Sequence, residues 1–252
     1  MLAARVAIVS GGSRPPIVLV HGAANSAGVW RFWQAALAER GWSSWALDLR
    51  GHGASPGDLS RASMTDYADD VTNLTRELPR PPVLVGWSMG GLAALMAAAR
   101  GGVAAWIGLA PSPPAPRRDP AVPLREGTFG AEEYGIVDLD PDAQPSMPDL
   151  DADERRIALA SLGRESRRAR DERKAGVVLM APPCPALVVA STGDASFPPA
   201  GYDSLCVPAA IRIVEGASHW GLVLNRRMLV TLVPMVVDWL NAAPSAPAPP
   251  TR

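Results

Sequence analysis

The sequence feature that most constrains the fold is a short apolar run over residues 83–87 that leads into the pattern Gly-x-Ser-x-Gly at residues 86–90. An alanine- and leucine-rich stretch follows it, and this order predicts a strand, a sharp turn with Ser88 at its tip, and a helix. Gly86 and Gly90 suit such a turn because they carry no Cβ where the backbone is crowded. The helix N-terminus would direct N–H groups and a positive dipole end toward an oxyanion formed at Ser88.

Further apolar runs alternate with helix-like segments along most of the chain. Continuous apolar runs are typical of strands buried on both faces. We expect strands near 5–10, 17–20, 42–49, 83–87, 103–109, 186–190 and 211–214. We expect helices over 29–40, 64–78, 89–100 and 222–240, the last of them broken near Pro234. The alternation predicts an α/β fold with a mostly parallel sheet, helices on both faces, and ligands bound at the carboxyl ends of the strands.

The alternation stops at residue 111 and resumes after residue 176. We therefore predict a core formed by 1–110 and 177–241, with an inserted, mainly helical lid or cap over 111–176 and a flexible, proline- and alanine-rich tail over 242–252. The insertion is acidic in its first part and arginine-rich over 155–174, where one or two amphipathic helices are expected. The alternative is that it forms a partly disordered surface excursion.

Composition narrows the class of protein. The 252 residues carry a net charge of −1, which argues against a nucleic-acid binder with a basic surface. We find neither the roughly 18–20 residue apolar run of a membrane span nor a secretory signal, so we expect a cytoplasmic protein. The two cysteines fit no metal motif, and we expect no metal and no cofactor.

Catalysis by a serine nucleophile requires a base, a group that orients the base and donors for the oxyanion. Among the three histidines, only His219 follows both Ser88 and a candidate acid, in the chain order Ser…Asp…His. The candidate acid is Asp194, which closes a predicted strand. The sequence thus predicts Ser88, Asp194 and His219 as the catalytic residues.

Three other polar residues follow strands but are interpreted differently. Asp48 is a rival for the role of the acid, although it precedes Ser88 in the chain. His21 lies in a tight turn and is interpreted as shaping it. His52 lies in a glycine-rich loop and is interpreted as holding that loop by hydrogen bonds.

Backbone groups and aromatic rings complete the predicted site. The N–H groups of Ala23 and Met89 are the expected oxyanion donors. Trp87 and Trp220 flank the predicted nucleophile and base, and together with Ala24 they are candidates for the substrate pocket. For the two tryptophans, packing beneath the site is an equal alternative.

In combination, these motifs resemble those of the α/β-hydrolase superfamily. Residues 21–22 are similar to its oxyanion loop, 48–53 to its structural loop, 86–91 to its nucleophile elbow, and 193–194 and 216–219 to its acid and histidine loops. The resemblance covers 15–110 and 182–241. That family usually begins with two antiparallel strands, but only 16 residues precede Ile17, so we expect a shortened hairpin or a single strand. Ser88 also departs from the dehalogenase and epoxide hydrolase branches, which have aspartate at the elbow.

Within this superfamily, the sequence Gly-Trp-Ser-Met-Gly-Gly over 86–91 is similar to that of carboxylesterases of the pimeloyl-carrier-protein methyl ester type. The resemblance implies a serine esterase whose substrate is a small-molecule ester or thioester, with an acyl carrier protein as a partner held by arginines of the lid. We expect cleavage through an acyl-enzyme. The alternatives are C–C hydrolase, lyase or cyclase chemistry on the same scaffold, and a ligand-binding protein with slow turnover.

Overall fold

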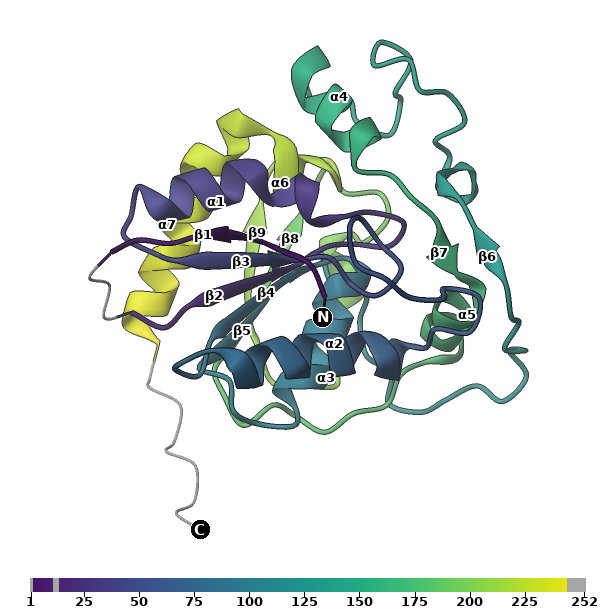
Figure 1. Ribbon diagram of the computed structural model, residues 1–252, viewed down its shortest axis with the longest axis horizontal. Helices are drawn as coiled ribbons and strands as arrows, with labels where there is room; N and C mark the ends of the chain where they lie inside the picture. The colour runs from purple at the N-terminus through teal and green to yellow at the C-terminus, as the bar shows by residue number, and fades with distance from the viewer. Residues whose placement is uncertain (1, 11–13, 244–252) are drawn as a thin grey trace.

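A computed structural model of the chain describes residues 2–10 and 14–243, and its centre is a seven-stranded sheet (Figure 1). Its strands are β1 (Ala4–Ala7), β2 (Ile17–Val20), β3 (Ser44–Leu47), β4 (Val83–Trp87), β5 (Ala105–Leu109), β8 (Ala186–Ser191) and β9 (Ala210–Val214). β2, β4, β5 and β8 are fully buried, as their continuous apolar runs predict.

The strand order is β1-β3-β2-β4-β5-β8-β9. Every neighbouring pair is parallel except β1 and β3, in which Ala4 lies opposite Leu47 and Ala7 opposite Ser44. The predicted mostly parallel sheet is therefore confirmed. Among the described residues, one antiparallel strand precedes β2, in agreement with the reduced hairpin expected from the short N-terminal stretch.

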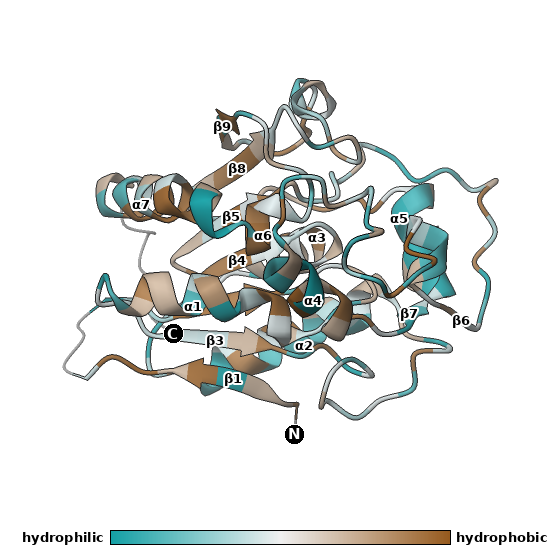
Figure 2. Ribbon diagram, turned by 90° about the horizontal axis from the view of Figure 1, so that it is seen from above, coloured by the Kyte–Doolittle hydropathy of each residue, from teal (hydrophilic) through white to brown (hydrophobic). Residues whose placement is uncertain are grey.

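Helices cover both faces of the sheet (Figure 1). One face is covered by α1 (Arg31–Ala38), α6 (Gly221–Leu224) and α7 (Arg226–Ala242), and the 3-10 turn η1 (Ala27–Trp30) precedes α1. The other face is covered by α2 (Met64–Glu77) and α3 (Met89–Ala98). α3 is buried almost throughout because it lies between the sheet and α2. Figure 2 shows the resulting hydrophobic centre, with brown strands β4, β5 and β8, whereas α5 at one end of the molecule is mostly teal.

The C-terminal helical region departs from the prediction of a break near Pro234. The break instead lies at Asn225, whose extended backbone separates α6 from α7 and whose side-chain oxygen caps α7 by accepting from the N–H groups of Arg227 and Met228. Pro234 stands inside α7, where it deprives the carbonyl of Val230 of a helical partner. Val230 itself is 72% exposed, so this turn of α7 lies at the protein surface.

The 111–176 segment leaves the sheet after β5 and lies along one end of it (Figure 1). It contains the 3-10 turn η2 (Ala131–Tyr134) and two helices in the arginine-rich part, α4 (Ala152–Ala160) and α5 (Arg167–Ala175). It also contains a pair of two-residue antiparallel strands that the sequence did not reveal, β6 (Thr128–Phe129) and β7 (Glu165–Ser166). A further 3-10 turn, η3 (Pro199–Tyr202), follows β8. Residues 244–252 of the predicted tail lie outside the described residues.

Candidate active site

Ser88 lies in the sharp turn between β4 and α3, with a strained backbone at φ 56° and ψ −124°. A Cβ on Gly86 would lie 2.3 Å from the carbonyl oxygen of Gly90, and one on Gly90 would lie 2.1 Å from that of His21. Only glycine fits at these two positions, which lets α3 pack against the strand ends. The Ser88 carbonyl accepts hydrogen bonds from the N–H groups of Gly91 and Ser112, at 3.0 and 2.9 Å.

His219 and Asp194 form a close pair, with 2.6 Å between His219 Nδ1 and Asp194 Oδ2. The other carboxylate oxygen accepts from the N–H groups of Ser196 and Phe197, at 2.8 and 3.0 Å. Burial alone would raise the pKa of Asp194, but the hydrogen bond and charge of His219 and these two N–H groups outweigh it and lower the pKa. The carboxylate is thus held charged and oriented toward the imidazole.

The His219 ring lies between aromatic side chains. Its centroid is 4.9 Å from that of Trp87 and 5.4 Å from that of Phe197. Trp87 is buried, and its Nε1–H donates to the His219 carbonyl at 3.0 Å. Trp87 therefore packs beneath the site and holds the His219 loop, whereas Trp220 contributes to the wall of a cavity. The two tryptophans, which the sequence could not distinguish, have different positions.

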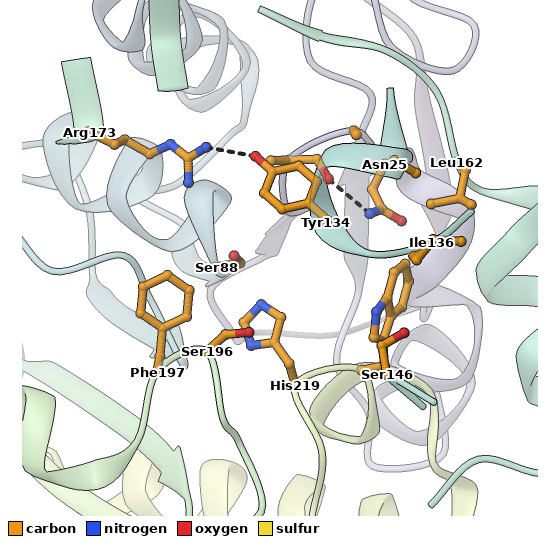
Figure 3. Close-up of a pocket in the computed structure, with 14 residues that line it drawn as sticks. Asn25, Ser88, Tyr134, Ile136, Ser146, Leu162, Arg173, Ser196, Phe197 and His219 are labelled. Atoms are coloured by element: carbon orange, nitrogen blue, oxygen red, sulfur yellow. Dashed lines mark hydrogen bonds between the residues drawn. The ribbon is translucent and has the colours of Figure 1, made fainter. Parts of the chain in front are cut away.

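A cavity of about 240 Å³ opens next to Ser88 and His219 (Figure 3). Its wall is mostly apolar and combines loops after β2, β4, β8 and β9 with the 111–176 segment. It is lined by Ala23, Ala24, Asn25, Ser88, Ala131, Tyr134, Ile136, Ser146, Leu162, Arg173, Ser196, Phe197, His219 and Trp220. The structure thus brings Ser88, His219, Ala23, Ala24 and Trp220 to one cavity, with Asp194 directly behind His219.

The loop after β2 is held by the 111–176 segment on both sides of Ala24, whose φ is 53°. The Ala24 N–H donates to Glu165 Oε2 at 3.0 Å, and the Ala24 carbonyl accepts from the Gly163 N–H at 2.9 Å. The next residue, Asn25, accepts from the Ser161 hydroxyl at 2.7 Å. Because the Ala24 N–H is bound to Glu165, Ala23 is the better candidate for the second oxyanion donor in this loop.

Glu165 lies at the centre of a buried polar cluster and is itself fully buried. Its Oε1 accepts from the Tyr67 hydroxyl at 2.5 Å and from the Ser166 N–H at 2.7 Å, while its Oε2 lies 3.4 Å from His52 Nε2, an ion-pair distance. Burial would raise the pKa of Glu165, but the nearby charge of His52 and the hydrogen bond from the Tyr67 hydroxyl lower it to about 2. Burial would likewise lower the pKa of His52, yet Glu165 raises it above the usual value.

The other polar groups near the loop act as supports. His21 Nε2 accepts from the Leu49 N–H at 3.2 Å, so Nδ1 carries the proton and donates to the Gly22 carbonyl at 2.8 Å. Burial and the nearby charge of His52 lower the pKa of His21 to about 4, which keeps the ring neutral. The Asp48 carboxylate accepts from the N–H groups of Ala27 and Ala54 and so joins two loops, away from His219.

Glu165, Tyr134 and Arg173 were not identified from the sequence. All three lie in the 111–176 segment, within a run of charged residues that is typical of a solvated surface. A weak signal existed for Glu165, because it is an acid in the middle of the arginine-rich stretch. Its burial depends on contacts with residues 98 and 141 positions away, which no local pattern reveals.

Across residues 2–10 and 14–243, no three His, Cys, Asp or Glu side chains come together as a metal site would require. Within the same ranges, no helix combines the length and apolar character needed to cross a membrane.

Residues 17–229 match the model of the alpha/beta hydrolase family. Protein phosphatase methylesterase 1 of Mus musculus is 39% identical over 106 residues, which cover 40% of this chain and 28% of that protein. The pimeloyl-[acyl-carrier protein] methyl ester esterase of Methylococcus capsulatus is 37% identical over 91 residues, covering 36% of this chain and 34% of that protein. The match thus spans about a third or less of the length of these curated relatives.

Among solved structures, the monoacylglycerol lipase of Paleococcus ferrophilus superposes with a TM-score of 0.68 at 23% sequence identity, over 96% of this chain and 99% of that one. An esterase from Thermogutta terrifontis superposes with a TM-score of 0.67 at 20% identity, over 95% and 93% of the two chains. At these identities, the likeness shows a shared fold.

Proposed function

The chain belongs to the alpha/beta hydrolase family, and on that premise we propose that it is a serine hydrolase that cleaves a carboxylic ester or thioester of a small substrate. The observation that carries the proposal is the Asp194–His219 pair at 2.6 Å, which shares one cavity with Ser88 at the strained turn. The two curated relatives support the reaction class, since they are named as a methylesterase and a methyl ester esterase.

In the proposed mechanism, the Ser88 hydroxyl attacks the ester carbonyl while His219 Nε2 takes its proton. The His219 Nδ1–H donates to Asp194, which fixes the tautomer and stabilises the imidazolium that forms. His219 then gives the proton to the leaving alcohol or thiol, and an acyl group remains on Ser88. A water molecule, deprotonated by His219, attacks this acyl-enzyme and releases the acid.

The negative charge that develops on the carbonyl oxygen needs donors on the opposite side from His219. We assign this role to the backbone N–H groups of Met89, at the start of α3, and of Ala23. Each such donor contributes roughly 3–4 kcal/mol to transition-state stabilisation. The Glu165 contact to Ala24 holds the loop that presents the Ala23 N–H.

We further propose that the 111–176 segment is the lid of this site. Six of the residues lining the cavity come from this segment: Ala131, Tyr134, Ile136, Ser146, Leu162 and Arg173. The cavity is smaller than the roughly 300–1,000 Å³ of typical drug-sized sites, which favours a short acyl group.

An acyl carrier protein is a subsidiary proposal for a partner, supported by the name of one relative. The lid arginines expected to hold it are largely engaged within the segment, since Arg167 and Arg170 pair with Glu133, and Arg168 with Glu172. An acidic carrier surface would have to displace these carboxylates. Faster hydrolysis of a carrier-bound ester than of the same free methyl ester would support the partner, and equal rates would exclude it.

An active-site fluorophosphonate tests the nucleophile directly. We expect it to label the wild type on Ser88 and not to label Ser88→Ala, while Ser60→Ala, which removes an exposed hydroxyl bound to Asp58, labels normally. Turnover of short-chain esters should disappear in Ser88→Ala and His219→Ala. A wild type that is neither labelled nor active on esters would refute the proposal in favour of non-ester chemistry or a binding role. A Ser88→Ala variant that keeps full turnover of esters would refute Ser88 as the nucleophile.

A further inference from the structure

The cavity beside Ser88 contains one group that ester hydrolysis does not require. Among the described residues that line it, Arg173 is the one with a permanent charge. The remaining wall is apolar or carries hydroxyl, amide and imidazole groups. A half-buried guanidinium at the edge of a mostly apolar cavity needs a partner for its charge, so its position calls for an explanation.

The other arginines of the same helix provide a comparison. Arg167, Arg168 and Arg170 of α5 each form an ion pair with a glutamate of the 111–176 segment. Within the described part of the chain, no ion pair includes Arg173. Of the four arginines in α5, three are in ion pairs. The fourth, Arg173, is the one that lines the cavity.

The Arg173 guanidinium is held in place by neutral groups. Nη2 donates to the Tyr134 hydroxyl at 3.0 Å, and Nη1 lies 3.4 Å from the Ser112 hydroxyl. The buried Nε–H finds no partner among the described residues. Figure 3 shows Arg173 reaching into the cavity with its guanidinium turned toward Tyr134. The backbone of Ser112 is in turn bound to that of Ser88, so the positive charge lies close to the nucleophile.

A structural role as counter-ion of Glu165 does not account for this arrangement. Glu165 is near enough for its pKa to be lowered by the charge of Arg173, but this is the last of the causes, after His52 and Tyr67. The carboxylate is already bound by the N–H groups of Ala24 and Ser166 and by the Tyr67 hydroxyl. The other acid at the site, Asp194, is bound to His219.

We infer that Arg173, with Tyr134, forms a subsite for a carboxylate of the substrate, so that the enzyme acts on half-esters: short acyl esters that carry a free carboxylate at the end remote from the scissile bond. This inference rests on the proposed function and names its substrate class. The carboxylate accepts from Nη1 and Nη2 of the planar guanidinium, each of which has a second N–H beyond the one directed at Ser112 or Tyr134. Tyr134, whose oxygen accepts from Arg173, keeps its own proton to donate to the same ligand.

The subsite also disfavours neutral esters. A substrate that ends in a methyl or amide group leaves the Arg173 guanidinium without a counter-ion in the cavity, and sites whose polar groups are left without a partner discriminate strongly. The small cavity limits the spacer between ester and carboxylate to a few methylene groups.

The test compares monomethyl esters of succinate, glutarate and adipate with their uncharged isosteres, in which an amide replaces the carboxylate. For the best chain length, we expect the wild type to show a kcat/KM at least about tenfold higher for the carboxylate than for the amide. In Arg173→Met this ratio falls to within about twofold of unity. In Arg173→Lys, which keeps the positive charge but lacks the paired N–H groups of a guanidinium, the ratio is intermediate. The control, Arg168→Met, removes an arginine of the same helix that pairs with Glu172, and it keeps the wild-type ratio.

A binding measurement separates this inference from the proposed esterase activity. Calorimetry of the half-ester with Ser88→Ala, and with the double variant that also carries Arg173→Met, should show at least about a tenfold loss of affinity in the latter. Arg173-dependent binding without hydrolysis by the wild type would uphold the subsite and refute the esterase. Hydrolysis with a ratio near unity, or a ratio that Arg173→Met leaves unchanged, would overturn the subsite and leave the esterase standing. Binding that does not depend on Arg173 would also overturn the subsite.

Discussion

Replacing Glu165 with glutamine perturbs the buried cluster with almost no change of volume. One side-chain position must then carry an NH2 group in place of an oxygen. If the NH2 replaces Oε2, it faces the Ala24 N–H, and if it replaces Oε1, it faces the Ser166 N–H. Either orientation leaves a buried backbone donor without an acceptor, at a cost of about 1–3 kcal/mol. The ion pair with His52 is also lost.

The magnitude of the charge effect follows from the pKa of Glu165. A fall from 4.5 in the unfolded chain to about 2 in the fold corresponds to about 3 kcal/mol of stabilisation of the charged form. Loss of one partner of a buried ion pair typically costs 3–5 kcal/mol, which agrees with this figure. We therefore expect Glu165→Gln to lower the free energy of unfolding by about 3 kcal/mol.

The pH dependence has a definite sign. Because the pKa of Glu165 is depressed in the fold, its contribution is present above about pH 4.5 and is lost as the pH falls toward about 2. Because the pKa of His52 is raised, its contribution is present below its unfolded value of 6.5 and is lost as the pH rises through the folded value. The difference between wild type and variant should therefore be largest between about pH 4.5 and 6.5.

Urea unfolding followed by tryptophan fluorescence at pH 3.5, 5.5 and 8.5 would measure this difference. At the same time, kcat should fall about ten- to a hundredfold, less than for complete removal of an oxyanion donor, since the Ala23–Ala24 loop is loosened but present. The control is Glu126→Gln, which alters an exposed pair with Arg61 and should change stability by less than about 0.5 kcal/mol. A Glu165→Gln variant that loses less than about 1 kcal/mol at pH 5.5, or a difference independent of pH, would refute the reasoning.

Two further expectations concern the proposed catalytic pair and the turn. Asp194→Asn should lower kcat by about a thousand- to ten-thousandfold without unfolding the protein, because an amide can no longer hold the His219 tautomer; a loss below about tenfold would contradict the assigned role. Gly90→Ala should lower the free energy of unfolding in urea by about 3 kcal/mol or more, because its Cβ would lie 2.1 Å from a backbone oxygen. The control is Gly201→Ala, which has open space around it and should be nearly neutral. Equal effects of the two variants would show that the close approach at Gly90 does not matter.

The parts of the molecule that local sequence patterns predict well are those whose cause is local. Continuous apolar runs are buried strands because both faces of a parallel sheet are covered, and the glycines around Ser88 are required by the turn itself. The order of Ser88, Asp194 and His219 along the chain was sufficient to place them at one edge, because parallel strands share their carboxyl ends. In the structure, His219 Nδ1 lies 2.6 Å from Asp194 Oδ2.

The parts that the sequence did not reveal depend on distant contacts. Glu165 stands among arginines and looks like a surface residue, yet Ala24, Tyr67 and His52 surround it in the fold. The break between α6 and α7 lies at Asn225, where a side chain caps the next helix, while Pro234 stands inside α7, four residues after the exposed Val230. The burial of Glu165 and the position of the helix break therefore depend on contacts made in the folded chain, which the residues next to them in the sequence do not show.

Three hydrogen bonds tie the 111–176 segment to the loop at Ala24 and Asn25, and they also limit how such a chain can be redesigned. They involve Gly163, Glu165 and Ser161. A graft of the whole 111–176 segment from a relative would carry away the groups that fix both the N–H and the carbonyl of Ala24. The loop that contains Ala24 and the 111–176 segment would then have to be exchanged together. Changes confined to 131–146, which lines the cavity through Ala131, Tyr134, Ile136 and Ser146, would leave all three of these bonds in place.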